Sequence, residues 1–417
     1  MTKKSDAPAI RFKGFSDAWE QRKLSEMCGT FEYGLNAAAK EFDGKNKYIR
    51  ITDIDDASRE FLLSDLSSPD ICLDGMSKYL LSSGDIVFAR TGASVGKTYI
   101  YRENDGIVYF AGFLIRAKVN QDNDAEFVFQ STLSPSYEKY IRITSQRSGQ
   151  PGVNAQEYSE YDLFAPSKEE QQRIGHFLQG IDNLITLHQR KFEKLTNVKK
   201  SMLEKMFPQN GSSYPEIRFK GFTDPWEQRK LGELVDRVVR KNTNNESTLP
   251  LTISAQYGLV DQITYFNNRV ASRDVSNYYL VLNGEFAYNK STSDGYPFGA
   301  VKRLDLYEKG VLSTLYIVFA PKKEQQIDSD YLTVFFDTDR WHKGVAERAA
   351  EGARNHGLLN ISAEDFFDID LSVPKDIVEQ KQIGAFIRQL DHLITLHQRE
   401  LEKLQNIKKS MLEKMFV

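Results

Sequence analysis

The sequence predicts an α+β protein with two pseudo-symmetric globular domains joined by two long antiparallel coiled-coil helices. Two internal duplications carry this prediction. The segment IRFKGFSDAWEQRKLSEM at 10–27 recurs as IRFKGFTDPWEQRKLGEL at 217–234. The segment IGHFLQGIDNLITLHQRKFEKLTNVKKSMLEKMF at 174–207 recurs as IGAFIRQLDHLITLHQRELEKLQNIKKSMLEKMF at 383–416. The stretches between these blocks have diverged, which indicates one unit written twice around two different inserts.

The bulk composition is that of a globular protein with more than one domain. The chain has 417 residues, of which 40% are hydrophobic, and a formal net charge of -3. This charge neither indicates nor excludes nucleic acid, because binding depends on where the charge lies. Cys28 and Cys72 form neither a disulfide framework nor a zinc-binding spacing. With no signal sequence and no apolar run of about 20 residues, we expect a soluble cytoplasmic protein that does not enter a membrane.

Each half begins with a strand-rich segment. Short apolar runs with Gly, Asp and Asn between them predict strands at 47–54, 84–90 and 113–119. Counterparts follow in the second half, at 249–254, 284–290 and 314–321. The predicted organisation is a tail at 1–10, a domain at 11–168, a helix at 169–207, a linker at 208–216, a domain at 217–375 and a helix at 376–417.

The long repeat is the clearest helix signal in the chain. Apolar residues recur with alternating spacings of four and three, which is typical of a coiled-coil seam. The predicted seam comprises Ile181, Ile185, His188, Leu195 and Met202 in the first copy, and Leu390, Ile394, His397, Leu404 and Met411 in the second. The alternative is two ordinary amphipathic helices, each lying on its own domain. A polar residue on such a seam more often fixes register than binds metal, so we expect no metal at His188 or His397.

A helix of this length would act as a spacer. About 34 residues at about 1.5 Å each give about 50 Å. On duplex DNA this distance corresponds to about 15 base pairs. If DNA is the ligand, the helices are therefore a ruler for two separated half-sites.

Two polar loops follow equivalent strands and are candidates for DNA contacts. The first, at 89–97, overlaps TGASVGKT at 91–98, which has one residue too few between its glycines for a phosphate-binding loop and leads into a strand instead of a helix. The second lies at 288–299. The alternative for both is a solvated hairpin. The candidates are Arg90, Thr91, Ser94 and Lys97 in the first loop, and Asn289, Lys290 and Ser291 in the second.

A second polar cluster precedes each long helix, at 142–154 and 347–360. Arginine, glutamine and asparagine side chains can bond guanine and adenine edges through two atoms at once. Ordinary surface loops carry the same residue types. The candidates here are Arg147, Gln150, Asn154, Arg348, Arg354 and Asn355.

Catalytic signatures are missing from the sequence. It contains no Gly-x-Ser-x-Gly, no His-Glu-x-x-His and no motif by which adenine methyltransferases grip a flipped base. We therefore expect a chain that recognises its ligand and does not catalyse.

The whole arrangement resembles the specificity (S) subunit of a type I restriction–modification enzyme. The resemblance covers essentially the whole chain and rests on three features in duplicated order. Each domain begins with WEQRKL, at 19–24 and 226–231. Each ends with Pro, then Glu-Gln-x-x-Ile-Gly, at 166–175 and 374–384, followed by the long helix.

The resemblance implies two target recognition domains, each reading one half of a split asymmetric DNA site. It implies helices that set the gap and dock two methyltransferase (M) subunits, with restriction and translocase (R) subunits joining them. S-adenosylmethionine, ATP and Mg²⁺ would then belong to those partners, with no cofactor in this chain. Two alternatives stay open: an enzyme acting on nucleotides through the loop at 91–98, and a structural adaptor whose helices tether two protein-binding domains.

Overall fold

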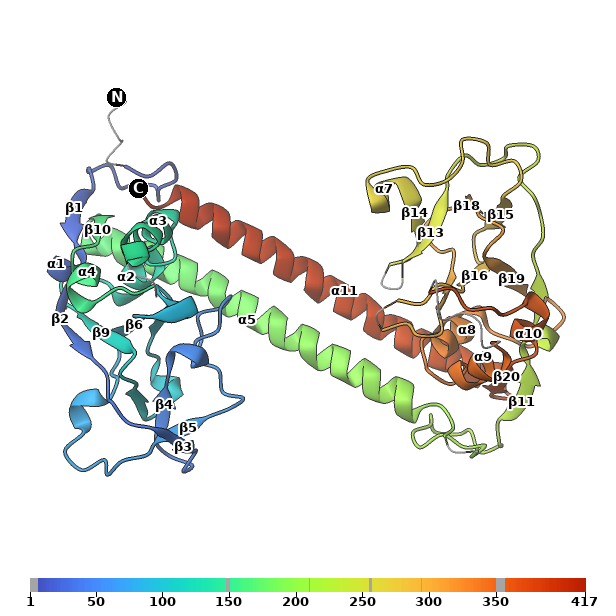
Figure 1. Cartoon of the computed structure of the whole chain (residues 1–417), viewed down its shortest axis with the longest axis horizontal. Helices are drawn as coiled ribbons and strands as arrows, with labels where there is room; N and C mark the ends of the chain where they lie inside the picture. Colours follow the sequence, from blue (N-terminus) through green and yellow to red (C-terminus); the bar gives the residue numbers. More distant parts are fainter. Residues whose placement is uncertain (1–6, 148–150, 210, 255–256, 294, 350–356) are drawn as a thin grey trace. The chain divides into compact units, whose positions relative to one another are not determined.

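The chain forms two compact units, each described here by itself. The first unit comprises residues 1–191 and 397–417, and the second comprises residues 192–396. The computed structural model describes residues 7–147, 151–209, 211–254, 257–293, 295–349 and 357–417. Figure 1 labels most of the helices and strands along the chain. No helix in the described ranges is long and apolar enough to cross a membrane.

The first unit is built on a four-stranded antiparallel sheet in the order β2-β9-β6-β7. Its strands are β2 (Cys28–Tyr33), β9 (Leu114–Val119), β6 (Asp85–Ala89) and β7 (Thr98–Ile100). β6 is buried along its whole length because both faces of the sheet are covered. Ile86 and Phe88 face a core to which residues of α5 also contribute, whereas Val87 and Ala89 face a second core on the opposite face of the sheet. This alternation is the period of two that a strand imposes.

Smaller elements surround this sheet. The strands are β1 (Glu20–Lys23), β3 (Ala39–Glu41), β4 (Lys47–Ile49), β5 (Ser67–Pro69), β8 (Val108–Phe110) and β10 (Asp162–Ala165). The helices are α1 (Leu24–Met27), α2 (Ala125–Ser131), α3 (Pro135–Thr144) and α4 (Ala155–Ser159), with short 3-10 turns between them.

The strand predicted at 47–54 is only partly correct. β4 ends at Ile49, and a 3-10 turn follows over Ile51–Asp53. The Asp53 carboxylate accepts hydrogen bonds from the backbone N–H of Arg50 at 2.9 Å and from its guanidinium at 2.8 Å. This side-chain bonding competes with a strand ladder and turns the chain.

The second unit repeats the central sheet in the order β12-β19-β16-β17. Its strands are β12 (Val235–Arg237), β19 (Ile317–Pro321), β16 (Phe286–Asn289) and β17 (Ala300–Arg303). Phe286 and Tyr288 face the core that includes α11, and Ala287 faces a second core. The two units therefore share one fold although their inserts have little sequence in common.

The other elements of the second unit match those of the first only in part, since the described segment between β3 and β6 of the first unit has no α-helix in the place of α7. The strands are β11 (Glu227–Lys230), β13 (Leu251–Ser254), β14 (Gly258–Asp261), β15 (Tyr279–Leu282), β18 (Lys309–Leu312) and β20 (Asp370–Val373). The helices are α6 (Leu231–Leu234), α7 (Gln262–Phe266), α8 (Ser329–Phe336), α9 (His342–Arg348) and α10 (Ala363–Phe367).

The repeated Glu-Gln-x-x-Ile-Gly motif fastens each long helix to its unit. In the first unit Glu170 accepts two bonds from the Arg11 guanidinium, at 2.7 and 2.8 Å. The Gln171 side chain accepts the backbone N–H of Asp124, which caps α2. A Cβ on Gly175 would lie 2.5 Å from the Asp124 carboxylate, so glycine is what lets the helix come this close. Gln380 and Gly384 do the same against α8.

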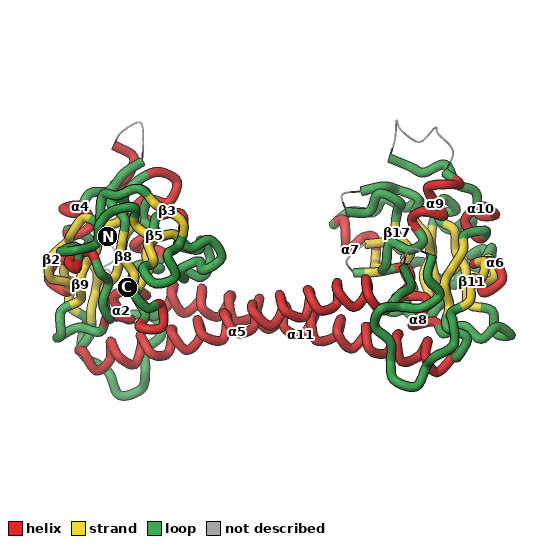
Figure 2. Tube along the Cα trace, turned by 90° about the horizontal axis from the view of Figure 1, so that it is seen from below, coloured by secondary structure: helices red, strands yellow, loops and turns green. Residues whose placement is uncertain are grey.

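The two long helices are α5 (Lys168–Lys205) and α11 (Ile377–Lys414), and they run antiparallel where they meet. In the first unit the early part of α5 lies alongside the late part of α11 (Figure 2). Asp182 pairs with Lys408 at 2.5 Å, and His188 Nδ1 lies 3.1 Å from His397 Nδ1. Since a later residue of α5 meets an earlier residue of α11, the direction is fixed.

The predicted seam residues occupy the less exposed face of both helices. Ile185 and Met411 pack against the first core, and Leu195 and Met202 pack against the second. The others are buried (Ile181, Leu390) or half-buried (His188, Ile394, His397, Leu404). The coiled-coil prediction is confirmed over the alternative of isolated helices.

We predict that the stability of the first unit depends on pH through the His188–His397 pair. Burial, His188 and the nearby Lys191 lower the pKa of His397. The unfolded chain therefore binds more protons, and stability falls as the pH drops from about 6.5 toward the lower folded pKa. We expect the midpoint of thermal unfolding to fall between about pH 7.5 and about pH 5.5, and His397→Gln to show a smaller fall. An equal fall in the variant would contradict this role.

Candidate nucleic-acid interface

One edge of the central sheet in the first unit collects the ends of three strands. β2 and β6 both pair antiparallel with β9, so their C-terminal ends meet the start of β9. Tyr33 ends β2, Arg90 follows β6, and Phe113 precedes β9. The backbone N–H of Arg90 donates to the Phe113 carbonyl at 3.1 Å. The first predicted loop therefore begins at this edge.

The structure brings the two predicted polar segments of the first unit together. Val153 donates its backbone N–H to the Arg90 carbonyl at 2.9 Å, and Gly92 donates to the Pro151 carbonyl at 3.0 Å. Thr91 and Gly152 form an antiparallel bridge between these bonds. Segments about 60 residues apart in the sequence thus form one surface.

The second unit makes the same junction with different residues. Leu359 donates its backbone N–H to the Lys290 carbonyl at 3.0 Å, and Thr292 donates to the Gly357 carbonyl at 2.6 Å. Ser291 and Leu358 form the bridge between them. The geometry of the loop pair is therefore shared by the units, whereas its side chains are not.

The side chains of the first loop have different roles. The Arg90 guanidinium lies over the rings of Tyr33 and Phe113, with its carbon 5.1 and 5.7 Å from their centroids. Thr91 and Ser94 are half-buried within the turn. Lys97 forms an ion pair with Asp56 and is only 14% exposed, so its charge is already compensated within the chain.

The loop at 91–98 lacks the architecture of a nucleotide site. The residues after Lys97 form strand β7, where a phosphate-binding loop would start a helix. Gly96 has a φ of +83°, and a Cβ there would lie 2.6 Å from the Ile141 side chain. This glycine serves packing against α3.

The second cluster of the first unit is described only in part. Asn154 caps α4, its side chain accepting the backbone N–H of Glu157 at 2.9 Å. Its side chain is exposed as well, so it lies at the surface while holding the helix. The Arg147 side chain and Gln150 lie outside the described residues, as do Arg354 and Asn355 in the second unit.

In the second loop, two of the three candidates are bonded to their own chain. The Asn289 side chain accepts the backbone N–H of Ser291 at 3.0 Å. The Lys290 ammonium donates to the Ile361 carbonyl at 3.4 Å. Ser291 itself is exposed.

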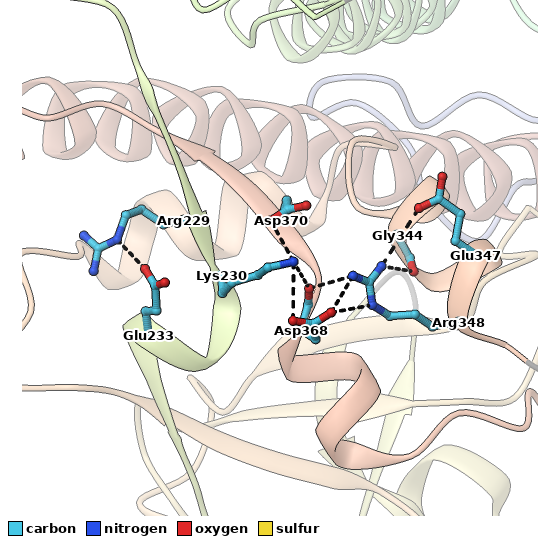
Figure 3. A network of polar contacts seen from close by, with 8 residues as sticks. All are labelled: Arg229, Lys230, Glu233, Gly344, Glu347, Arg348, Asp368 and Asp370. Atoms are coloured by element: carbon cyan, nitrogen blue, oxygen red, sulfur yellow. Dashed lines mark hydrogen bonds and ion pairs between the residues drawn. The ribbon is translucent and has the colours of Figure 1, made fainter.

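Arg348 belongs to a network of polar contacts on the second unit (Figure 3). Its guanidinium binds the Asp368 carboxylate at 2.7 Å, and Lys230 reaches Asp370 at 3.1 Å and Asp368 at 3.4 Å. Hydrogen bonds from Arg348 and Lys230 lower the pKa of Asp368. The network ties α9 to β11 and β20, so Arg348 has a positioning role in this structure.

Tyr33 and Phe113 were not among the residues predicted from the sequence. Single exposed aromatic residues are common at strand ends, and the two are far apart in the chain. The only available signal was that each stands next to a glycine, Gly34 and Gly112 respectively.

Comparison with known proteins decides the family. Residues 16–197 and 223–406 each match the family described as type I restriction modification DNA specificity domain. The chain belongs to this family. It carries the DNA specificity domain twice, so the predicted specificity subunit with two target recognition domains is confirmed.

Individual relatives agree with the family match over nearly the full length. The type I restriction enzyme MjaVIII specificity subunit of Methanocaldococcus jannaschii is 22% identical over 368 residues, covering 85% of this chain and 83% of that protein. The crystal structure of a type I restriction–modification system S subunit from M. genitalium is similar in fold, with a TM-score of 0.65, 13% identity and 99% of each chain covered.

Proposed function

We propose that this chain is the subunit that selects the DNA sequence for a type I restriction–modification complex. Each unit would read one half of a split, asymmetric site, with the domains spanning about 11–168 and 217–375. The observation that carries the proposal is the repeated loop junction. The same two loops meet at the same sheet edge in both units, while the side chains at 90–92 and 290–292 differ.

We place catalysis on partner subunits. Two methyltransferase (M) subunits would transfer methyl groups from S-adenosylmethionine, and restriction (R) subunits would use ATP and Mg²⁺ for translocation and cleavage. The absence of methyltransferase and phosphate-loop motifs from the sequence supports this division. Partner subunits that share the phosphate contacts would also account for binding by a chain whose net charge is -3.

We assign the gap between the half-sites to α5 and α11. Their pairing is fixed by matched contacts, because Asp182–Lys408 in the first unit has an equivalent in Lys199–Asp391 at 2.6 Å in the second. Lysines along a mostly apolar seam that each meet an aspartate favour one register over its alternatives.

Expressing the chain with its methyltransferase subunit in a host tests the function, with the methylated positions read by sequencing. We expect a bipartite motif of two short specified blocks separated by unspecified bases. Replacing residues 25–167 with those of a relative should change one block only. A continuous motif, or no sequence-specific methylation, would contradict the proposal. Duplex DNA left unprotected by the assembled complex would favour the structural adaptor.

A further inference from the structure

We propose that Arg90 reads a guanine in the half-site bound by the first unit, donating two N–H groups to its O6 and N7 atoms. The inference rests on the proposed function and adds to it a base identity and a residue. It is carried by the Tyr33–Arg90–Phe113 stack at the sheet edge.

The Arg90 backbone is held from both sides. Its N–H donates to Phe113 and its carbonyl accepts from Val153, so the residue joins the central sheet to the polar cluster at 142–154. The neighbouring Ala89 carbonyl accepts the hydroxyl of the buried Tyr158 at 2.7 Å. A side chain on such a rigid base loses little backbone entropy when it binds.

The Arg90 guanidinium has aromatic neighbours, whereas three other arginines of the unit bind carboxylates. Arg11, Arg50 and Arg102 bind Glu170, Asp53 and Glu126 respectively. Within the described residues Arg90 has no such partner, and its Nε atom is buried without a hydrogen-bond acceptor. A planar guanidinium whose N–H groups have no acceptor within the chain is suited to a ligand that offers two acceptors in one plane.

The two rings fix the orientation of the guanidinium. Tyr33 is 44% exposed and Phe113 is 56% exposed, so the stack lies at the surface. The rings accept no hydrogen bond from the guanidinium, and because its Nε atom is buried, the two terminal nitrogens are the donors that remain for a base. Guanine presents O6 and N7 together in the major groove, and arginine bonded to both is the commonest base-specific contact.

The second unit has no equivalent stack among its described residues. Lys290 occupies the position of Arg90, and its ammonium donates to a backbone carbonyl instead. A lysine has no such planar group. Arg90 and Lys290 thus hold equivalent backbone positions at the start of their loops but have different side-chain chemistry. Such a difference is expected if the two units read unlike half-sites.

The test uses the full chain assembled with its methyltransferase subunits and duplexes bearing the site found by methylome sequencing. Each guanine of the two half-sites is replaced in turn by 7-deazaguanine, which lacks the N7 acceptor but still pairs. We expect the wild-type complex to lose roughly fivefold to tenfold in affinity at one guanine of one half-site. Arg90→Ala and Arg90→Lys should bind the native site more weakly and show no further loss at that guanine.

Arg173→Ala is the matched control, because Arg173 is an exposed arginine on α5 of the same unit and lies outside both polar segments of the candidate interface. It removes the same charge and should keep the full 7-deazaguanine effect. Midpoints of thermal unfolding verify that the Arg90 variants fold. An Arg90→Ala complex that binds every duplex more weakly by the same factor and keeps the 7-deazaguanine effect would overturn the inference. A wild-type complex without any specific site would instead overturn the proposed function.

Discussion

Phe207→Ala is expected to lower the free energy of unfolding of the second unit by about 3–5 kcal/mol. Phe207 stands just after the end of α5, and only 1% of its surface is exposed. Its ring lies 5.8 Å from both Trp226 and Tyr331 and 6.3 Å from Phe335, measured between centroids. Truncation leaves a cavity among large rings that cannot all close in. Denaturant unfolding, with hydrogen exchange to assign the loss to one unit, measures it.

Two variants make the comparison specific. Phe416→Ala, at the end of α11, removes the equivalent ring from Trp19 and Phe127 and should destabilise the first unit. Phe266→Ala, in α7 with its side chain 50% exposed, should change stability by no more than about 0.5 kcal/mol. Lost protection confined to the first unit in Phe207→Ala would contradict the assignment of the end of α5 to the second unit.

The sequence predicted the elements whose signal is local. The long helices follow from an unbroken heptad pattern, and β6, β9 and β16 from short apolar runs near their observed bounds. The short helices α3 and α8 were not predicted, because their apolar faces extend over only a few turns. The pairing of β1 with β10 and of β11 with β20 joins residues that are far apart in the sequence, which no local pattern records.

The location of the site could be predicted from the sequence better than the side chains that form it. The internal duplication indicated that the loops at 89–97 and 288–299 are equivalent. In the structure each of these loops is hydrogen-bonded to the second polar cluster of its own unit. It also gives several candidates partners that sequence could not reveal. Lys97 meets Asp56 from a distant turn, and Arg348 meets Asp368, which lies 20 residues further along the chain. Polar residues in a loop look alike in sequence whether they face a ligand or hold the fold, because the distinction depends on partners brought by tertiary structure.

Inserting seven residues into each long helix is expected to lengthen the preferred gap between the half-sites by about three base pairs. The insertions go after Gln189 in α5 and after Gln398 in α11, next to the His188–His397 pair and opposite each other in the antiparallel arrangement. One heptad preserves the seam. It adds about 10 Å at about 1.5 Å per residue, and duplex DNA rises about 3.4 Å per base pair. Binding to a library of sites with increasing gaps measures the optimum.

The sequences of the two half-sites should not change, because the insertions leave the sheet edges at Arg90 and Lys290 untouched. The same seven residues placed after Gly211, in an exposed turn outside both helices, should leave the gap unchanged. An insertion in α5 alone should weaken binding at every gap, since Lys199 and Lys408 could no longer both reach Asp391 and Asp182 with one register. A doubly extended chain that still prefers the original gap would remove the helices from the role of spacer and leave the spacing to the partner subunits.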